Sequence, residues 1–145
     1  MKFMILLKSD NEIEAGVLPS EALLAEFAQF NGDLVRSGVL LAAEGLRPSA
    51  DGVRVHLAGD RSTTVDGPFA EARDQVAGFW LIDVPSQQDA VDRFSRMPHV
   101  QGGHTVVEIR PVMAQDDFGD AMTPELRATE DRLRAEGNAR LNNEQ

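Results

Sequence analysis

Polar residues alternate along one short segment of the second half of the chain, "HTVVEIRPV". In an extended strand, residues two apart point to the same face, so His104, Glu108 and Arg110 share one face. An imidazole, a carboxylate and a guanidinium at that spacing could bind a polar ligand or exchange a proton in a shared cleft. Zinc sites need three or four protein ligands, which this segment does not supply, so we expect no metal centre.

Glu44 is a carboxylate inside an otherwise apolar segment, "VLLAAEGL". If its side chain points inward, burial raises the pKa of the carboxyl group, and Glu44 becomes a candidate acid, base or ligand anchor. If it lies on an exposed face near the end of a strand, it has no such role. The sequence leaves both alternatives open.

The segment "TTVDGPFAEA" combines an Asp-Gly pair with a proline and an aromatic residue. Asp66 can accept hydrogen bonds from nearby backbone amides, Gly67 can take a positive φ, and Pro68 cannot donate to a strand ladder. Each residue therefore has a role in ending a strand, and this is the interpretation we favour. In the alternative interpretation, Asp66, Phe69 and the following polar segment with Glu71 and Arg73 line the mouth of a ligand pocket.

Trp80 is a further candidate for the ligand site, although a tryptophan in an apolar strand is more often part of a core or an interface. His56 and His99 are expected to be solvated. The sequence contains no phosphate-binding glycine loop, dinucleotide-binding motif, zinc-protease motif or serine-nucleophile motif. We therefore expect no cofactor.

The net charge of -10 arises from acidic residues spread along all 145 residues. Because no basic cluster could neutralise phosphates, we expect neither nucleic acid nor a membrane as a partner. The chain has no cysteine, which suits a reducing compartment. The apolar run in "KFMILLK" is too short for a signal peptide or a membrane span, so a cytoplasmic protein is predicted.

Hydrophobic periodicity predicts the elements that position these residues. Ser20 is placed to cap a helix whose apolar stripe ends before Gly38, and Ser86 is placed to cap a second helix that Pro98 stops. The predicted strands cover residues 3–7, 39–46, 77–84 and 104–112, and the predicted helices cover residues 20–38 and 86–98. A polar loop is expected between the first strand and the first helix.

"VRVHLAGDRSTTVDG" is predicted to form a hairpin. A two-residue loop, Gly59-Asp60, would place the apolar side chains of its two strands on opposite faces. A three-residue loop, Gly59–Arg61, places them on the same face, so the pattern favours it. That register sets Arg54 opposite Asp66 in an exposed ion pair that contributes about 0.2 to 1 kcal/mol.

The order of elements predicts an α+β fold with two helices on a mostly antiparallel sheet. Two helices cover one face of a sheet, yet the strands at residues 3–7 and 77–84 are apolar on both faces. A monomer would leave a large apolar patch exposed. We therefore expect a homodimer formed by sheet stacking, with roughly 800 Å² buried per partner.

The segment "VDGPFAEARDQVAGFWLIDV", with "LLAAEGLRPS" before it and "VEIRPV" after it, resembles the DGPF subgroup of the YCII-related domain family. The resemblance covers residues 1 to about 113, and the tail "AQDDFGDAMTPELRATEDRL" also fits the subgroup. It implies a ferredoxin-like domain at residues 1–113 that forms a dimeric α/β barrel, with an added β-hairpin. From the residues themselves, 114–145 are predicted to form a polar tail in which Thr123 caps a helix at about 123–136. This helix either clasps the neighbouring subunit or frays, and the residues after Gly137 are expected to be disordered.

Catalysis by a His and Asp pair has been proposed for some YCII-related proteins, with the histidine early in the first helix. The resemblance raises the question whether this chain has the same pair. This chain has no histidine between Pro19 and Gly38, and it has Met97-Pro98-His99 where those proteins have Asp-Pro. Their chemistry is therefore not carried over. Members of the family are often encoded beside sigma factors of the extracytoplasmic-function type, which implies a regulatory setting.

Three functions follow from these observations. The favoured one is a homodimer that binds a small molecule or a protein partner in a cleft at the sheet. The second is a small enzyme, hydrolase or oxygenase-like, that uses Glu44, Asp66 or His104 as acid or base. The third is a structural module whose tail helix makes the contacts.

Overall fold

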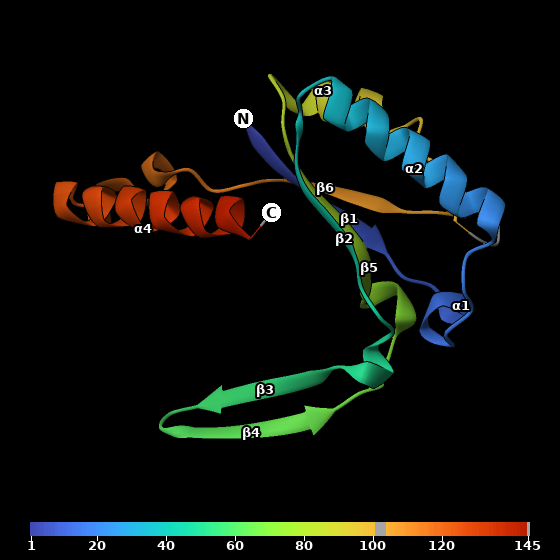
Figure 1. Ribbon diagram of the computed structural model, residues 1–145. Helices are drawn as coiled ribbons and strands as arrows, with labels where there is room; N and C mark the ends of the chain where they lie inside the picture. Colours follow the sequence, from blue (N-terminus) through green and yellow to red (C-terminus); the bar gives the residue numbers. More distant parts are fainter. Residues whose placement is uncertain (101–103, 145) are drawn as a thin grey trace. The chain divides into compact units, whose positions relative to one another are not determined.

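The computed structural model describes residues 1–100 and 104–144. The chain divides into two compact units, Met1–Val112 and Met113–Gln145. Figure 1 shows the elements of each unit: a sheet with helices and a hairpin in the first, and one long helix in the second. Among the described residues, none of the helices has the length and apolar character needed to cross a bilayer.

The first unit is built on a four-stranded antiparallel sheet with strand order β2-β5-β1-β6. Its strands are β1 (Lys2–Lys8), β2 (Leu40–Gly45), β5 (Val76–Asp83) and β6 (Val107–Pro111). The predicted central position of the first strand is confirmed. Over residues 1–100 and 104–144 the sheet is open, with β2 and β6 at its edges, and it does not close into a barrel within one chain.

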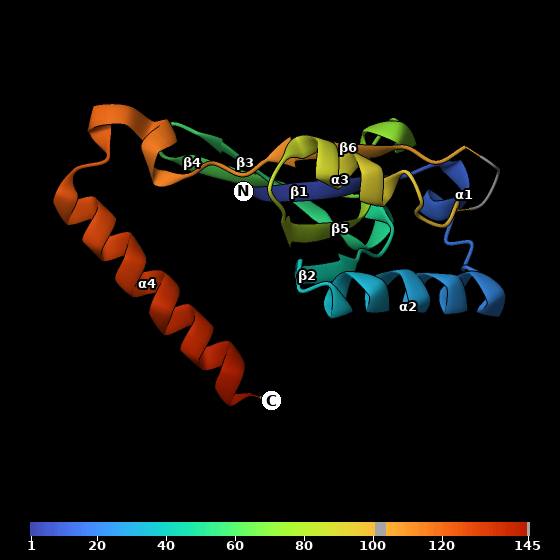
Figure 2. The same cartoon turned by 90° about the horizontal axis from the view of Figure 1, so that it is seen from above.

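Two helices, α2 (Glu21–Arg36) and α3 (Gln87–Phe94), lie on one side of this sheet (Figure 1, Figure 2). Both predicted caps are confirmed: the Ser20 hydroxyl accepts a hydrogen bond from the Leu23 amide at 3.1 Å, and the Ser86 hydroxyl accepts one from Asp89 at 3.2 Å. A short helix, α1 (Asn11–Glu14), forms in a segment that was expected to be a loop.

The core lies between the sheet and α2 and α3. Phe3, Ile5 and Ile82 are fully buried. Trp80 is 6% exposed, and its ring lies 5.3 Å from Phe94 in an edge-to-face arrangement. The remaining core side chains include Leu7, Leu34, Val39, Val84, Ala90 and Met97. Each large apolar side chain buried here contributes about 1.5 to 3 kcal/mol.

The hairpin of β3 (Val53–Ala58) and β4 (Arg61–Asp66) has a different register from the predicted one. Ala58 pairs with Arg61, so the loop has two residues, Gly59 and Asp60. Gly59 has φ +62° at the first loop position, where a type II′ turn requires glycine. The predicted three-residue loop and the predicted Arg54–Asp66 pair are therefore wrong, and Arg54 pairs with Val65.

The physical reason is the exposure of the hairpin. Every residue from 53 to 66 is exposed, so neither face of the hairpin is buried within the described structure. Burial normally specifies register, because a one-residue slip moves apolar side chains to the solvent face. Here the turn sets the register instead. In Figure 1 and Figure 2 the hairpin extends to the side of the sheet opposite α2 and α3.

The second unit contains a 3₁₀ segment, Gln115–Ala121, and the helix α4 (Pro124–Asn143). The Thr123 hydroxyl accepts a hydrogen bond from the Leu126 amide at 3.2 Å, as predicted for an N-cap. Within this unit Arg127 pairs with Asp116 at 2.8 Å. The helix continues past Gly137, where fraying was expected. One glycine costs only about 1 kcal/mol in a helix.

Candidate functional site

Three of the predicted site residues, Glu44, Glu108 and Arg110, lie on the face of the four-stranded sheet opposite α2 and α3, here called the open face. The registers align side chains in rows across this face. One row consists of Glu44, Phe79, Leu6 and Glu108, and the next consists of Ala42, Leu81, Met4 and Arg110. The centre of the open face is thus apolar, and charged side chains lie toward its edges.

The two carboxylates of the first row are far apart. Glu44 is on β2 and Glu108 is on β6, so three strand spacings of roughly 14 Å in total separate them. Glu108 instead pairs with Arg110 at 3.5 Å. Glu44 is exposed, as in the second alternative for this residue. Within one chain these residues form no acid–base pair.

His104 and Glu108 share a polar cavity of about 430 Å³ at the end of the sheet. Its lining also includes Lys8, Ser9, Asp10, Asn11, Glu12, Arg73 and Val106. The predicted strand 104–112 was expected to direct His104, Glu108 and Arg110 into one cleft. In the structure His104 precedes β6, and Arg110 does not line this cavity. The sequence offered Arg73 only as a pocket residue beside Asp66, and it did not indicate Lys8. Neither could be placed beside His104, because they come from a 3₁₀ turn, η2 (Ala72–Asp74), and from β1, far away in the chain.

The DGPF segment anchors the base of the hairpin to the rest of the first unit. The Ser49 hydroxyl accepts a hydrogen bond from the Phe69 amide at 3.0 Å, and it donates one to the Glu14 carboxylate. The Ser49 amide also donates to Glu14, at 3.2 Å. One serine therefore connects α1, the turn before β3 and the segment after β4.

Position 67 must be glycine because the backbone of Ser49 lies against it. A Cβ atom there would lie 1.8 Å from the Ser49 carbonyl oxygen, closer than any real contact. The Gly67 amide donates to the Gly52 carbonyl at 3.0 Å. Gly67 does not adopt the positive φ that was predicted, so its role is to allow this packing.

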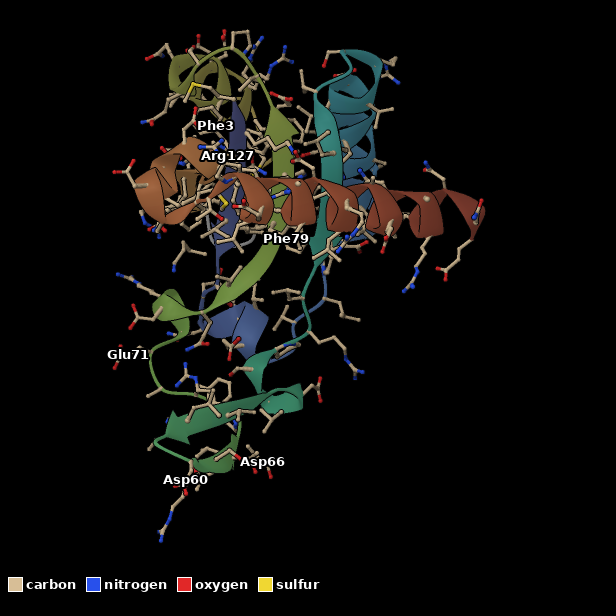
Figure 3. All side chains as sticks on the ribbon, turned by 90° about the vertical axis from the view of Figure 1, so that its left-hand side faces the viewer. Phe3, Asp60, Asp66, Glu71, Phe79 and Arg127 are labelled. Carbon is tan, nitrogen blue, oxygen red and sulfur yellow. The ribbon has the colours of Figure 1, made fainter. Side chains whose placement is uncertain are left out.

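Phe69 and Asp66 occupy different surroundings. Phe69 is half-buried, and the Arg54 guanidinium lies 3.9 Å from its ring centroid, a cation–π contact that replaces the predicted ion pair. Asp66 is exposed at the end of β4. In Figure 3 it lies at the hairpin, and Glu71 lies on the segment that leads on to β5. The local contacts support the strand-ending interpretation of this segment.

A larger cavity of about 620 Å³ lies beside α1, at the start of α2 and next to the ends of β1 and β2. Its apolar lining consists of Leu7, Ile13, Val17, Leu18, Pro19, Leu23, Phe27, Leu46, Pro48, Ala77 and Val100. Arg47 and Asp51 also line it, and they form an ion pair at 3.2 Å. We refer to it as the apolar cavity.

The α1 helix and the turn after it form one wall of the apolar cavity, and local interactions hold them in place. The Asp10 carboxylate accepts a hydrogen bond from the Ile13 amide at 2.8 Å and so caps α1. Gly16, with φ +83°, ends the turn and sends the chain toward α2. This cavity was not predicted, because the segment that forms α1 was expected to be a loop. Asp10 followed by acidic residues was the signal that could have revealed the helix.

Trp80 lies in the core, and its indole nitrogen donates a hydrogen bond to Asn31 at 2.8 Å. It lines neither the apolar nor the polar cavity. Among the described residues no three His, Asp or Glu side chains are grouped so that they could hold a metal ion.

The fold and the two cavities define a small α+β protein with one covered and one open sheet face. The chain belongs to the YCII-related domain family, which matches residues 1–118, and the resemblance to this family is confirmed. Its assignment to the DGPF subgroup stays a prediction.

The chain is 24% identical over 114 residues to an uncharacterised protein of Rhizobium meliloti (strain 1021), covering 77% of this chain and 92% of that protein. It is also similar in structure to 5-chloro-2-hydroxyhydroquinone dehydrochlorinase from Burkholderia phenoliruptrix AC1100, solved with 2,5-dihydroxybenzoquinone. That similarity has 13% identity and a TM-score of 0.40, and it covers 79% of this chain and 97% of the other. At this TM-score it carries no implication for the chemistry of this chain.

Proposed function

We propose that this protein is a homodimer that binds a small, largely apolar molecule in the apolar cavity. The observation that carries the proposal is the cavity itself. Its volume of about 620 Å³ is within the range of small-molecule sites, which are mostly lined by hydrophobic side chains with a few polar groups. The ion pair of Arg47 and Asp51 provides those polar groups here.

The geometry favours a ligand with an apolar body and one polar end. Leu23 and Phe27 from α2 and Ile13 from α1 would contact the body. The Arg47 side chain is 85% exposed, so it can turn toward a carboxylate, hydroxyl or carbonyl group of the ligand. Burial of the apolar part would provide most of the affinity.

The homodimer is proposed from the open face. Met4, Leu6, Phe79 and Leu81 are only half-buried there, although they lie on the two central strands. The β-α-β-β-α-β order of β1, α2, β2, β5, α3 and β6 matches a ferredoxin-like topology. Two such sheets stacked through their open faces would form the dimeric α/β barrel that the resemblance implies. A cytoplasmic location suits such a protein.

Binding is better supported than catalysis. Glu44 lies on β2, Asp66 at the end of β4 and His104 before β6. No two of these residues line the same one of the two cavities described above. A regulatory role stays a prediction.

Filling the apolar cavity tests the binding site. Leu23 lines the cavity, whereas its neighbour Leu24 does not and is 55% exposed. We expect Leu23→Trp to abolish binding of 1-anilinonaphthalene-8-sulfonate, an apolar probe with an anionic group, in a fluorescence titration. Leu24→Trp is the matched control and should bind it as the unmodified protein does. Equal binding by both variants would remove the cavity as the site.

A further inference from the structure

The hairpin exposes apolar side chains along one strand. Val53, Val55 and Leu57 are 55%, 58% and 79% exposed. Because they alternate along β3, they lie on the same face of the hairpin. Their cross-strand partners on that face are Asp66, Thr64 and Ser62 of β4. We call these three residues the apolar strip. The other face carries Arg54 and His56 of β3 with Val65 and Thr63 of β4 opposite them, and Val65 is 49% exposed.

A two-stranded hairpin with both faces in water is at best marginally stable on its own. Among the residues that the structure describes, no third strand joins this hairpin, since β3 and β4 form a sheet of two. Its residues from 53 to 66 are all exposed within the described structure. The apolar strip therefore lacks the cover that would stabilise such an element.

The base of the hairpin is held in place. The Gly67 amide bonds to Gly52, Ser49 bonds to Phe69, and Arg54 lies over the Phe69 ring. These contacts set the direction in which the hairpin leaves the first unit. It leaves on the side of the open face, as Figure 1 shows, and Figure 3 views the molecule from that side, with Asp60 at the hairpin tip.

We propose that the hairpin is an arm that clasps a second copy of this chain, with the apolar strip packed against the partner subunit. This proposal rests on the homodimer proposed above. When two open faces stack, each hairpin extends past its own sheet toward the other subunit. In a twofold dimer the contact is made twice, so both apolar strips are buried together. The arm thus extends the stacked-sheet interface without a break.

The charge of the hairpin fits the same partner. Two copies of a chain with net charge -10 repel each other. Residues 53 to 66 carry Arg54 and Arg61 against Asp60 and Asp66, so the hairpin is neutral when His56 is neutral. A neutral arm with an apolar strip can approach an acidic subunit with little electrostatic cost.

Paired variants of the full chain test the arm. We expect the double variant Val55→Ser/Leu57→Ser to raise the dimer dissociation constant roughly 100-fold, measured by analytical ultracentrifugation. The control His56→Ser/Thr63→Ser changes the opposite face of the hairpin and should leave the constant within about twofold. Far-UV circular dichroism checks that each variant keeps the fold.

A third variant separates this proposal from the homodimer itself. Leu6→Lys places a charge at the centre of the open face and should convert the protein to monomers. Suppose that Leu6→Lys breaks the dimer while Val55→Ser/Leu57→Ser does not weaken it. The proposal that the hairpin clasps the partner is then wrong, and the proposal of a dimer stacked through the open faces is kept. If the unmodified protein is monomeric at micromolar concentration, both proposals fail.

Proximity can be measured directly because the chain contains no cysteine. A spin label on Thr63→Cys is mixed with ¹⁵N-labelled subunits that carry no spin label. We expect broadening of amide signals in the ¹⁵N-labelled partner, since the arm lies against it. Intact mixed dimers without such broadening would place the hairpin away from the partner and overturn the proposal.

Discussion

The four-stranded sheet and the β3–β4 hairpin share an alternating pattern, but different forces set their registers. In the sheet, a slip of one residue would move Phe3 and Ile5 from the core to the open face. In the hairpin, a slip exchanges two exposed faces at almost no cost in burial. An alternating apolar pattern therefore predicts strand register reliably only where one face of the strand is buried in a core.

The largest expected effect compares a buried residue with an exposed one. Phe3→Ala removes a fully buried ring and should lower the free energy of unfolding by about 3 to 5 kcal/mol. Leu57→Ala in the hairpin should change it by no more than about 0.5 kcal/mol in the monomer. Urea denaturation, carried out in the Leu6→Lys background, measures both. Similar losses for the two variants would show that the hairpin is covered within one chain.

A smaller effect concerns the junction between the two regions. Gly67→Ala places a Cβ against the Ser49 carbonyl and should cost about 2 kcal/mol or more, because backbone must move. Gly45→Ala is the control, since in the described structure nothing beyond the neighbouring residues 44 and 46 lies within 4 Å of the added Cβ. Thermal unfolding of both variants measures the difference. A tolerated Gly67→Ala would mean that the junction is loose and does not direct the hairpin.

The smallest expected effect concerns the turn of the hairpin, and it tests whether the turn alone sets the hairpin register. Gly59→Ala strains a position with φ +62° and should cost about 1 kcal/mol within the hairpin. With no core to hold the register, we expect the loop to lengthen to three residues, so that Arg54 comes opposite Asp66. Cross-strand nuclear Overhauser effects distinguish this from the present pairing of His56 with Thr63. Retention of that pairing would show that something other than the turn sets it.

The open face and the polar cavity could be predicted in part from the sequence. Alternation placed Glu108 and Arg110 on one strand face, and it separated Trp80 from Phe79. It could not show that Glu44 and Glu108 occupy opposite edge strands, because strand order depends on long-range pairing. Nor could it show that Lys8 and Arg73 join His104, since these residues meet only in the folded chain.

The sequence by itself determined the strands, the capped helices and the family, because these follow from local periodicity, capping residues and a long distinctive segment. The tertiary structure decided what local signals leave open. The apolar cavity exists because α1 lies beside the start of α2, and Gly67 is glycine because the backbone of Ser49 lies against it. Such features depend on contacts between segments that are distant in the sequence. They cannot be predicted from the spacing of residues within one segment.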